Sequence, residues 1–133
     1  ILAAIPGESR VACGRALDAA AAAREAVADL NRARSAAGLP VTGFTLALHE
    51  GEVLYGNVGS RDRLDFTVVG PSVNEASRIQ ALCRSLDQPI LVSESFARAC
   101  GSGRERLVSV GRYALRGVER PQELFTLDHG DSR

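Results

Sequence analysis

The stretch Leu64-Asp-Phe-Thr-Val-Val-Gly-Pro-Ser-Val-Asn-Glu-Ala-Ser-Arg78 changes its hydrophobic period near its middle. In its first half apolar residues alternate with polar ones, which is typical of a strand. Gly70-Pro71 ends the alternation, and beyond it apolar residues recur at steps of three and four until about Asp87, which predicts a helix. The stretch therefore predicts a strand that passes almost directly into a helix.

The residues before this strand predict a β-hairpin. Residues 44–48 alternate with period 2, and residues 53–58 lead to a polar turn at residues 59–62. We expect residues 64–68 to form the returning arm, with a bulge near one of the hairpin's glycines.

One long helix is predicted in the N-terminal part of the chain. Residues 12–37 are rich in alanine, the best helix former, and Gly38 and Pro40 supply a stop. The apolar stripe that we expect to be buried consists of Cys13, Ala16, Ala20, Ala23, Val27 and Leu30. Residues 1–5 are a short apolar run that predicts a buried strand, and we interpret a chain that opens within a strand as truncated on its N-terminal side.

The remainder of the chain predicts shorter elements. Residues 90–92 indicate a brief strand, and Ser93 is placed to cap a short helix that ends at Gly101, with loop residues following. Residues 107–115 and 123–127 are interpreted as two terminal strands.

The order of the predicted elements is strand, helix, two strands, helix, strand, helix and two strands. This order favours an α+β sandwich with helices on one face of a largely antiparallel sheet, in a ferredoxin-like βαββαβ layout. No repeat or low-complexity linker divides the sequence, so we expect residues 1–133 to form a single domain.

Composition excludes several functional classes. The 133 residues are 45% apolar, and their 16 basic and 16 acidic side chains balance, which argues against a nucleic-acid partner. No apolar run is long enough to span a bilayer and no signal peptide is present, so we expect a cytoplasmic protein. The three cysteines are far apart, which argues against both a disulfide framework and a zinc site.

Asn74 and Arg78 are the best candidates for chemistry. They are four residues apart in the first turns of the predicted helix and lie on a face rotated away from its apolar stripe. The guanidinium fork of arginine suits phosphate oxygens, and asparagine can orient a hydroxyl or a ring oxygen. On spacing alone, a solvated helix face explains the pair better. No Rossmann fingerprint or Walker A loop occurs, and His49 and His129 have no partners at ligand spacing.

Several segments together resemble the bacterial class III adenylate/guanylate (nucleotidyl) cyclases, and the similarity covers essentially the whole chain. The segments are Gly51-Glu-Val-Leu-Tyr-Gly-Asn-Val-Gly-Ser60, Asp65-Phe-Thr-Val-Val-Gly70, Val73-Asn-Glu-Ala-Ser-Arg78, Pro89-Ile-Leu-Val-Ser93 and Leu115-Arg-Gly-Val-Glu-Arg-Pro-Gln-Glu-Leu-Phe125. The resemblance implies an adenylate cyclase catalytic domain that converts ATP to 3′,5′-cyclic AMP in intracellular signalling.

The resemblance also implies roles for individual residues. Asn74 matches the residue that positions the ribose, and Arg78 matches the arginine that stabilises negative charge at the α-phosphorus. Thr67 matches a position that helps to select the purine and is typical of ATP-specific bacterial members. Arg116 matches a basic residue that contacts the terminal phosphates, although Arg120 could also serve.

The chain departs from the family pattern on the metal side. The resemblance implies two Mg²⁺ or Mn²⁺ ions, bound by two Asp residues on segments that would precede Ile1, together with a purine-selecting Lys. This polypeptide alone is therefore expected to be inactive. The resemblance further implies a head-to-tail homodimer and a sensory or regulatory domain in the full-length protein. Two alternatives stay open: a catalytically dead homologue acting in dimerisation or nucleotide sensing, and a guanylate cyclase.

Overall fold

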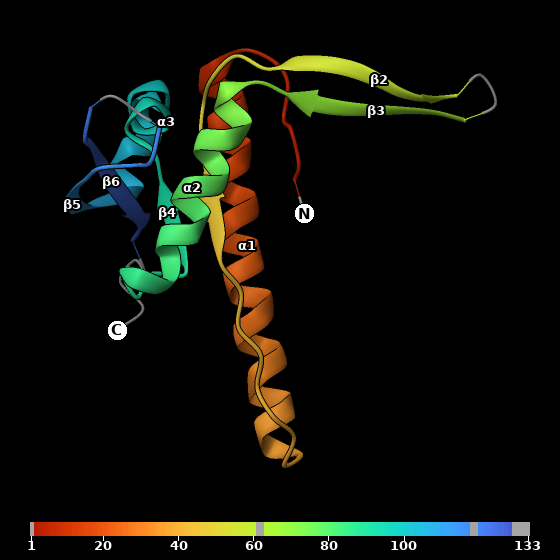
Figure 1. The fold of residues 1–133 in the computed structure, drawn as a ribbon. Coiled ribbons are helices and arrows are strands. Elements are labelled where there is room, and N and C mark those ends of the chain that lie inside the picture. Colours follow the sequence, from red (N-terminus) through yellow and green to blue (C-terminus); the bar gives the residue numbers. More distant parts are fainter. Residues whose placement is uncertain (1, 61–62, 118–119, 129–133) are drawn as a thin grey trace.

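A computed structural model describes residues 2–60, 63–117 and 120–128, and along residues 55–69 it describes the backbone alone. In chain order the elements are α1 (Ser9–Ala36), β1 (Leu46–Leu48), β2 (Leu54–Ser60), β3 (Arg63–Val69), α2 (Pro71–Ser85), β4 (Ile90–Val92), α3 (Glu94–Ala99), the 3₁₀ helix η1 (Gly101–Arg106), β5 (Leu107–Tyr113) and β6 (Gln122–Leu127). The α+β class is confirmed (Figure 1).

The described strands form one four-stranded sheet, in the order β1-β4-β6-β5, and a separate hairpin of β2 and β3. β1 and β4 are parallel, whereas β6 is antiparallel to both of its neighbours. The last described strand in sequence thus lies between two earlier ones. Its end is held by α1, because the guanidinium of Arg24 donates to the carbonyls of Leu127 and Asp128 at 3.0 Å each.

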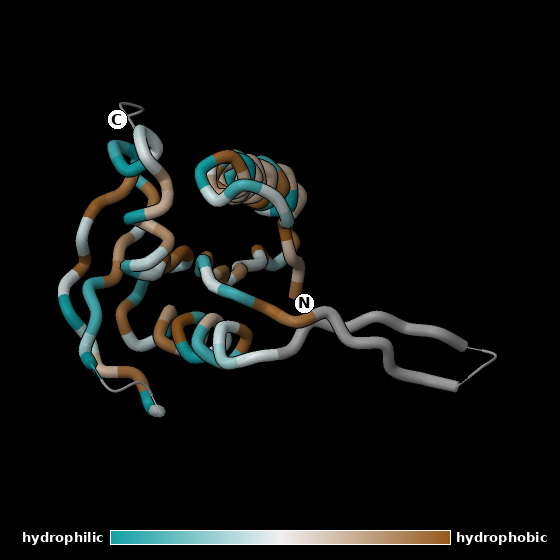
Figure 2. The backbone as a smooth tube through the Cα atoms, turned by 90° about the horizontal axis from the view of Figure 1, so that it is seen from above, coloured by the Kyte–Doolittle hydropathy of each residue, from teal (hydrophilic) through white to brown (hydrophobic). Residues whose placement is uncertain are grey.

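Helices cover both faces of this sheet (Figure 2). On one face, Val92 belongs to the same buried cluster as Leu17 of α1 and Phe96 of α3. On the other face, Leu91 belongs to a cluster with Ile79 of α2. The expectation that helices cover a single face is therefore wrong. The physical reason is that β4 is fully buried on both sides, so that successive residues point into opposite clusters.

The hairpin is regular and extends away from the sheet (Figure 1). Its described pairs run from Leu54–Val69 to Ser60–Arg63 without a shift in register, so the expected bulge does not occur among them. A register shift occurs instead in β5 between Ser109 and Gly111, where the φ of +113° at Gly111 favours glycine.

α1 is buried only in its first half. The helix begins after Glu8, whose carboxylate accepts hydrogen bonds from two backbone N–H groups of the first turn. Its buried residues are Cys13, Ala16, Leu17 and Ala20. Leu30, which the stripe placed in the core, is 47% exposed, because α1 extends past the sheet at that point.

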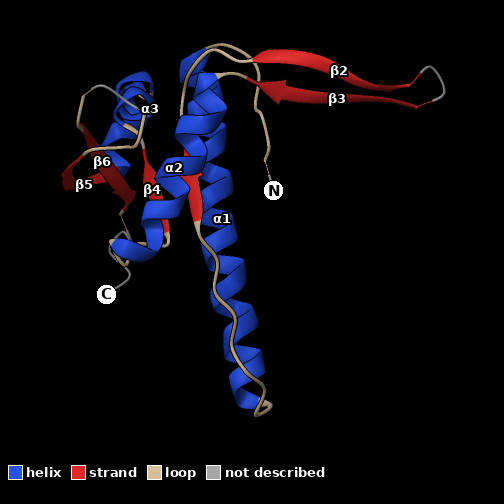
Figure 3. Ribbon diagram, viewed as in Figure 1, coloured by secondary structure: helices blue, strands red, loops and turns tan. Residues whose placement is uncertain are grey.

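The second half of α1 is accompanied by the chain that returns toward β1 (Figure 3). Asn31 holds this return segment through both of its amide atoms: Nδ2 donates to the Thr42 carbonyl at 2.7 Å, and Oδ1 accepts from the Thr42 N–H at 2.9 Å. The helix and the return segment therefore form a two-layer projection beside the sheet.

Two predicted elements differ in the structure. Residues 2–6 form no strand, and Leu2 and Ile5 are exposed, because no described strand pairs with this segment. The residues through Gly103, expected as loop, belong to the 3₁₀ helix η1, which continues to Arg106. The predicted cap of α3 is confirmed, since Ser93 Oγ accepts a hydrogen bond from the Phe96 N–H at 3.1 Å.

Candidate functional site

α2 begins at a sharp turn after β3. Gly70 has a φ of +136°, which favours glycine, and Pro71 occupies the first helical position, where its missing N–H costs no hydrogen bond. The Gly70 carbonyl accepts from the N–H groups of Val73 and Asn74 at 3.1 and 3.5 Å. The turn thereby places Asn74 at the start of α2, with Arg78 one helical turn later on the same side.

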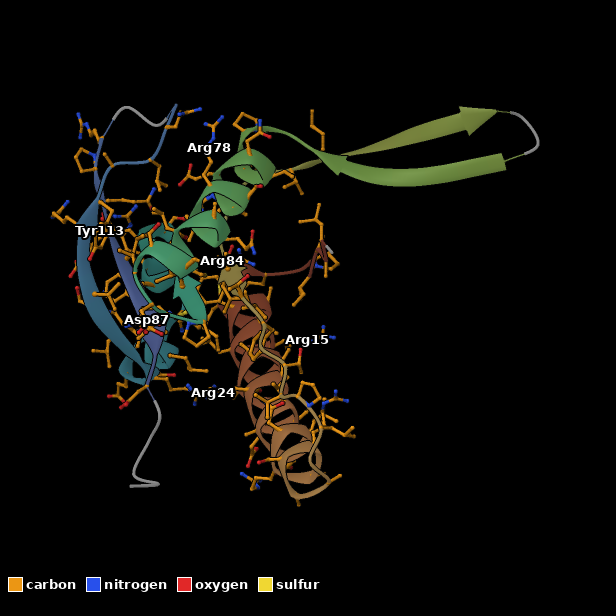
Figure 4. All side chains as sticks on the ribbon, turned by 60° about the horizontal axis from the view of Figure 1, so that its bottom comes forward. Arg15, Arg24, Arg78, Arg84, Asp87 and Tyr113 are labelled. Atoms are coloured by element: carbon orange, nitrogen blue, oxygen red, sulfur yellow. The ribbon has the colours of Figure 1, made fainter. Side chains whose placement is uncertain are left out.

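Arg78 reaches from α2 to the turn that follows β5 (Figure 4). Its Nη1 donates a hydrogen bond to the backbone carbonyl of Arg116. Gly117 makes room for this contact, because a Cβ at that position would collide with the guanidinium, and its φ of +80° also favours glycine. Arg78 is half-buried and Asn74 is exposed. The structure therefore brings two of the predicted site residues, Arg78 and Arg116, into direct contact.

The structure assigns fewer contacts to the other predicted site residues. Arg116 and Arg120 are both exposed, and only Arg116 contacts Arg78 through its backbone. Thr67 lies in β3 opposite Gly56, but its side chain is outside the part of the chain that the structure describes.

A polar cluster that the sequence did not predict includes a residue from the first turns of α2. We call it the Glu75 cluster, and its members are His49, Glu75, Ser93, Ser95 and Gln122. Oε2 of Glu75 accepts a hydrogen bond from Gln122 Nε2 at 2.9 Å and lies 3.7 Å from His49 Nε2. Nδ1 of His49 lies 2.8 Å from Ser93 Oγ and 3.3 Å from Ser95 Oγ. The cluster joins the end of β1 and the start of β6 to the starts of α2 and α3.

The members of the Glu75 cluster are distant in sequence, so no local motif could indicate it. The available signal was weak: His49 directly follows β1 and Glu75 lies in the first turns of α2, where polar side chains of separate elements can meet. His49, which has no partner at metal-ligand spacing in the sequence, is held within this cluster by Ser93.

Burial controls the charge of His49. Its side chain is only 7% exposed, and loss of hydration lowers its pKa from the ordinary 6.5. The carboxylates of Glu75 and Glu50 act in the opposite direction but do not outweigh burial. His49 is therefore neutral at pH 7, and its contact with Glu75 is not an ion pair at that pH.

The lowered pKa predicts that stability decreases as the pH falls below about 6.5. In that window the unfolded chain binds a proton at His49 that the folded chain resists, so the free energy of unfolding falls with pH. Each unit by which the pKa is lowered corresponds to about 1.4 kcal/mol. Urea unfolding at pH 7.5 and 5.5 should show this loss, and the His49→Asn variant should show a smaller one. Equal losses in both proteins would contradict the prediction.

A pocket of about 350 Å³ lies beside His49. It is formed by residues 2–7, α1, the end of β1 and the start of α2, to which Ser72 and Ala76 contribute. Because α2 turns by about 100° per residue, those two residues lie on the face opposite Asn74 and Arg78. The pocket is therefore separate from the face that carries the predicted site.

The described residues do not form a metal centre by themselves. In the described ranges, no three side chains of His, Cys, Asp or Glu lie where they could hold an ion together. No step of a metal-assisted reaction can therefore be assigned to these residues.

None of the described helices is both long enough and apolar enough to cross a bilayer.

Comparison with known proteins relates the chain to mycobacterial sequences and to a cyclase structure. No protein-family model matches the chain. The uncharacterized protein Rv1318c of Mycobacterium tuberculosis is 35% identical over 108 residues, which are 80% of this chain and 19% of that protein. The uncharacterized protein Mb1354c of Mycobacterium bovis is 34% identical over the same length. The chain thus spans about a fifth of the length of the curated relatives that it matches.

The solved structure of the guanylyl cyclase Cya2 has a similar fold. It superposes with a TM-score of 0.69 at 22% sequence identity, over 97% of this chain and 66% of that one. At this identity the likeness concerns the fold alone. In fold, the chain is therefore a class III nucleotidyl cyclase-like domain.

Proposed function

We propose that the chain is part of an adenylate cyclase, a phosphorus–oxygen lyase that converts ATP to 3′,5′-cyclic AMP and pyrophosphate in intracellular signalling. The observation that carries this proposal is the arrangement at the start of α2: Arg78 is fixed against the Arg116 turn, and Asn74 is exposed one turn earlier, in a chain with a cyclase fold. A guanidinium held in place before the substrate arrives does not have to be reorganised during the reaction.

The reaction needs such a group at the α-phosphate. The ribose 3′-oxygen loses its proton and forms a bond to the α-phosphorus, while the bond from that phosphorus to the bridging oxygen of pyrophosphate breaks. Negative charge accumulates on the α-phosphoryl oxygens in the transition state. We assign Arg78 to this charge, Asn74 to the ribose and Arg116 to the terminal phosphates, because these side chains belong to adjoining segments. We assign purine selection to Thr67.

A complete site would need a second segment. The described residues offer no group of three metal-ligating side chains. The Mg²⁺ or Mn²⁺ ions would be held by residues beyond the described ones. We propose that a head-to-tail homodimer supplies them, with the metal side of one subunit facing Asn74 and Arg78 of the other. The exposure of Asn74 and the hairpin arm that extends from the sheet support this assembly.

The full-length protein should form cyclic AMP from ATP when Mg²⁺ or Mn²⁺ is present. With ATP and GTP supplied together, we expect a kcat/KM for ATP at least about tenfold above that for GTP, and EDTA should abolish both reactions. Chromatography of the products distinguishes the candidates. Preferential formation of cyclic GMP would replace the proposal with a guanylate cyclase. Nucleotide binding or dimerisation without any cyclic product would identify a catalytically dead homologue.

A further inference from the structure

We propose that Glu75 is a positioning residue for the face of α2 that carries Asn74 and Arg78, and that it acts through its contacts with Gln122 and His49. The link to catalysis rests on the function proposed above. The positioning itself does not, because it concerns only how the first turns of α2 are held.

The start of α2 has little local support. Within the described residues no side chain caps the helix, and Pro71 contributes no N–H. The hydrogen bond from the Asn74 N–H to the Gly70 carbonyl is long, at 3.5 Å. A helix start of this kind frays unless tertiary contacts hold it. Asn74 itself is exposed and cannot provide them.

Glu75 provides a contact from this turn to the sheet. Its carboxylate accepts a hydrogen bond from Gln122 at the start of β6, at 2.9 Å. Hydrogen bonds to a charged group are the stronger ones, and this carboxylate is only 25% exposed. Gln122 is in turn fixed, because its Oε1 accepts from the backbone N–H of Glu94 at 3.3 Å. The first turn of α2 is thus connected to β6 and to α3.

His49 supports Glu75 from the other side. Its Nε2 lies 3.7 Å from the Glu75 carboxylate, and its ring is held by the Ser93 hydroxyl at 2.8 Å. Ser93 is fully buried and also caps α3, so its hydroxyl is fixed, and rotation of the ring would break the hydrogen bond to it. The imidazole therefore presents a fixed surface to Glu75.

The two neighbours of Glu75 explain why this matters for the site. Asn74 directly precedes it, and Arg78 follows three residues later, so both share its helical turn. Arg78 is held at its tip by the Arg116 carbonyl, whereas Glu75 holds the base of the turn. Without Glu75, the first turns of α2 lose their side-chain hydrogen bond to β6, whereas the contact of Arg78 with the Arg116 carbonyl remains. A displacement of about 1 Å at such a site can lower turnover by about 10².

Hydrogen–deuterium exchange of the full-length protein tests the positioning directly. In Glu75→Ala, the amides of residues 74–79 should exchange about tenfold faster than in the wild type, whereas those of residues 82–85, in the second half of α2, should not change. Gln122→Ala should accelerate the exchange of the same amides, because it removes the donor of the hydrogen bond to Glu75. Glu75→Gln should behave like the wild type, because a carboxamide oxygen can still accept from Gln122. Glu105→Gln, an exposed carboxylate in η1, is the control and should change nothing.

Kinetics of the same variants test the link to catalysis. Glu75→Ala should lower kcat about tenfold and change KM less than about twofold, with recovery in Glu75→Gln. Unchanged exchange at residues 74–79 in Glu75→Ala, or exchange in Glu75→Gln as fast as in Glu75→Ala, would overturn the positioning role. If the wild type makes no cyclic nucleotide, the proposed function fails, while the exchange result still decides the role of Glu75.

Discussion

Replacement of Arg78 by alanine in the full-length protein is expected to lower cyclic AMP production by about 10² to 10³ while leaving the fold intact. The guanidinium is already fixed by the Arg116 carbonyl and is only half-buried, so its removal deletes a preorganised charge without opening a cavity. Arg78→Lys should recover little activity, because an ammonium lacks the planar fork that can contact two phosphoryl oxygens. The initial rate with ATP and the urea midpoint measure the two effects separately.

A matched control is available on the same helix. Arg84 lies in the last turn of α2, exposed and far along the helix from Arg78 (Figure 4), and Arg84→Ala should keep activity within about twofold. Asn74→Ala should lower production by about 10² as well. Near wild-type turnover in both Asn74→Ala and Arg78→Ala would exclude this face of α2 from the reaction.

Leu17→Ala is expected to cost about 3 kcal/mol of unfolding free energy, the largest effect on stability among the substitutions considered. Leu17 is fully buried where α1 packs on the sheet, in the cluster that contains Val92 and Phe96. Truncation removes apolar contacts and leaves a cavity that helices packed on a sheet fill only in part. Urea unfolding at pH 7.5 gives the difference directly.

Leu30→Ala is the control for this prediction. It makes the same chemical change on the same helix, but Leu30 is 47% exposed, so the change should be within about 0.5 kcal/mol. Comparable losses of unfolding free energy in the two variants would mean that the second half of α1 is packed in solution rather than projecting from the protein.

The sequence predicted those elements whose signals are local. Ser93 is a preferred capping residue directly before a short helix, and Gly70-Pro71 marks a helix start, so α3 and α2 could be located from the chain alone. The contact between Arg78 and the Arg116 backbone needs two segments that only the fold brings together. The resemblance to cyclases suggested roles for both residues, but not that they touch.

The predictions that failed concern contacts between distant segments. Residues 2–5 have the apolar character of a strand, but a strand needs a partner, and this segment has none among the described strands. Leu30 continues the helical stripe of α1, but periodicity does not reveal where the sheet beneath a helix ends. Glu75 lies at the start of a helix, where a polar residue is expected whatever its role. Its role depends on contacts with Gln122 and His49, which are too far away in the sequence for a motif to indicate them.

The position of β6 between β4 and β5 has a consequence for biosynthesis. Leu124 and Phe125 complete the buried clusters on opposite faces of the sheet, so neither cluster can close until residues 122–127 have left the ribosome. α1 is translated about a hundred residues earlier. Its Arg24 therefore cannot form its hydrogen bonds until the carbonyls at the end of β6 have been synthesised. Because the long-range contacts form last, folding of this sheet is a late event that follows translation of nearly the whole segment.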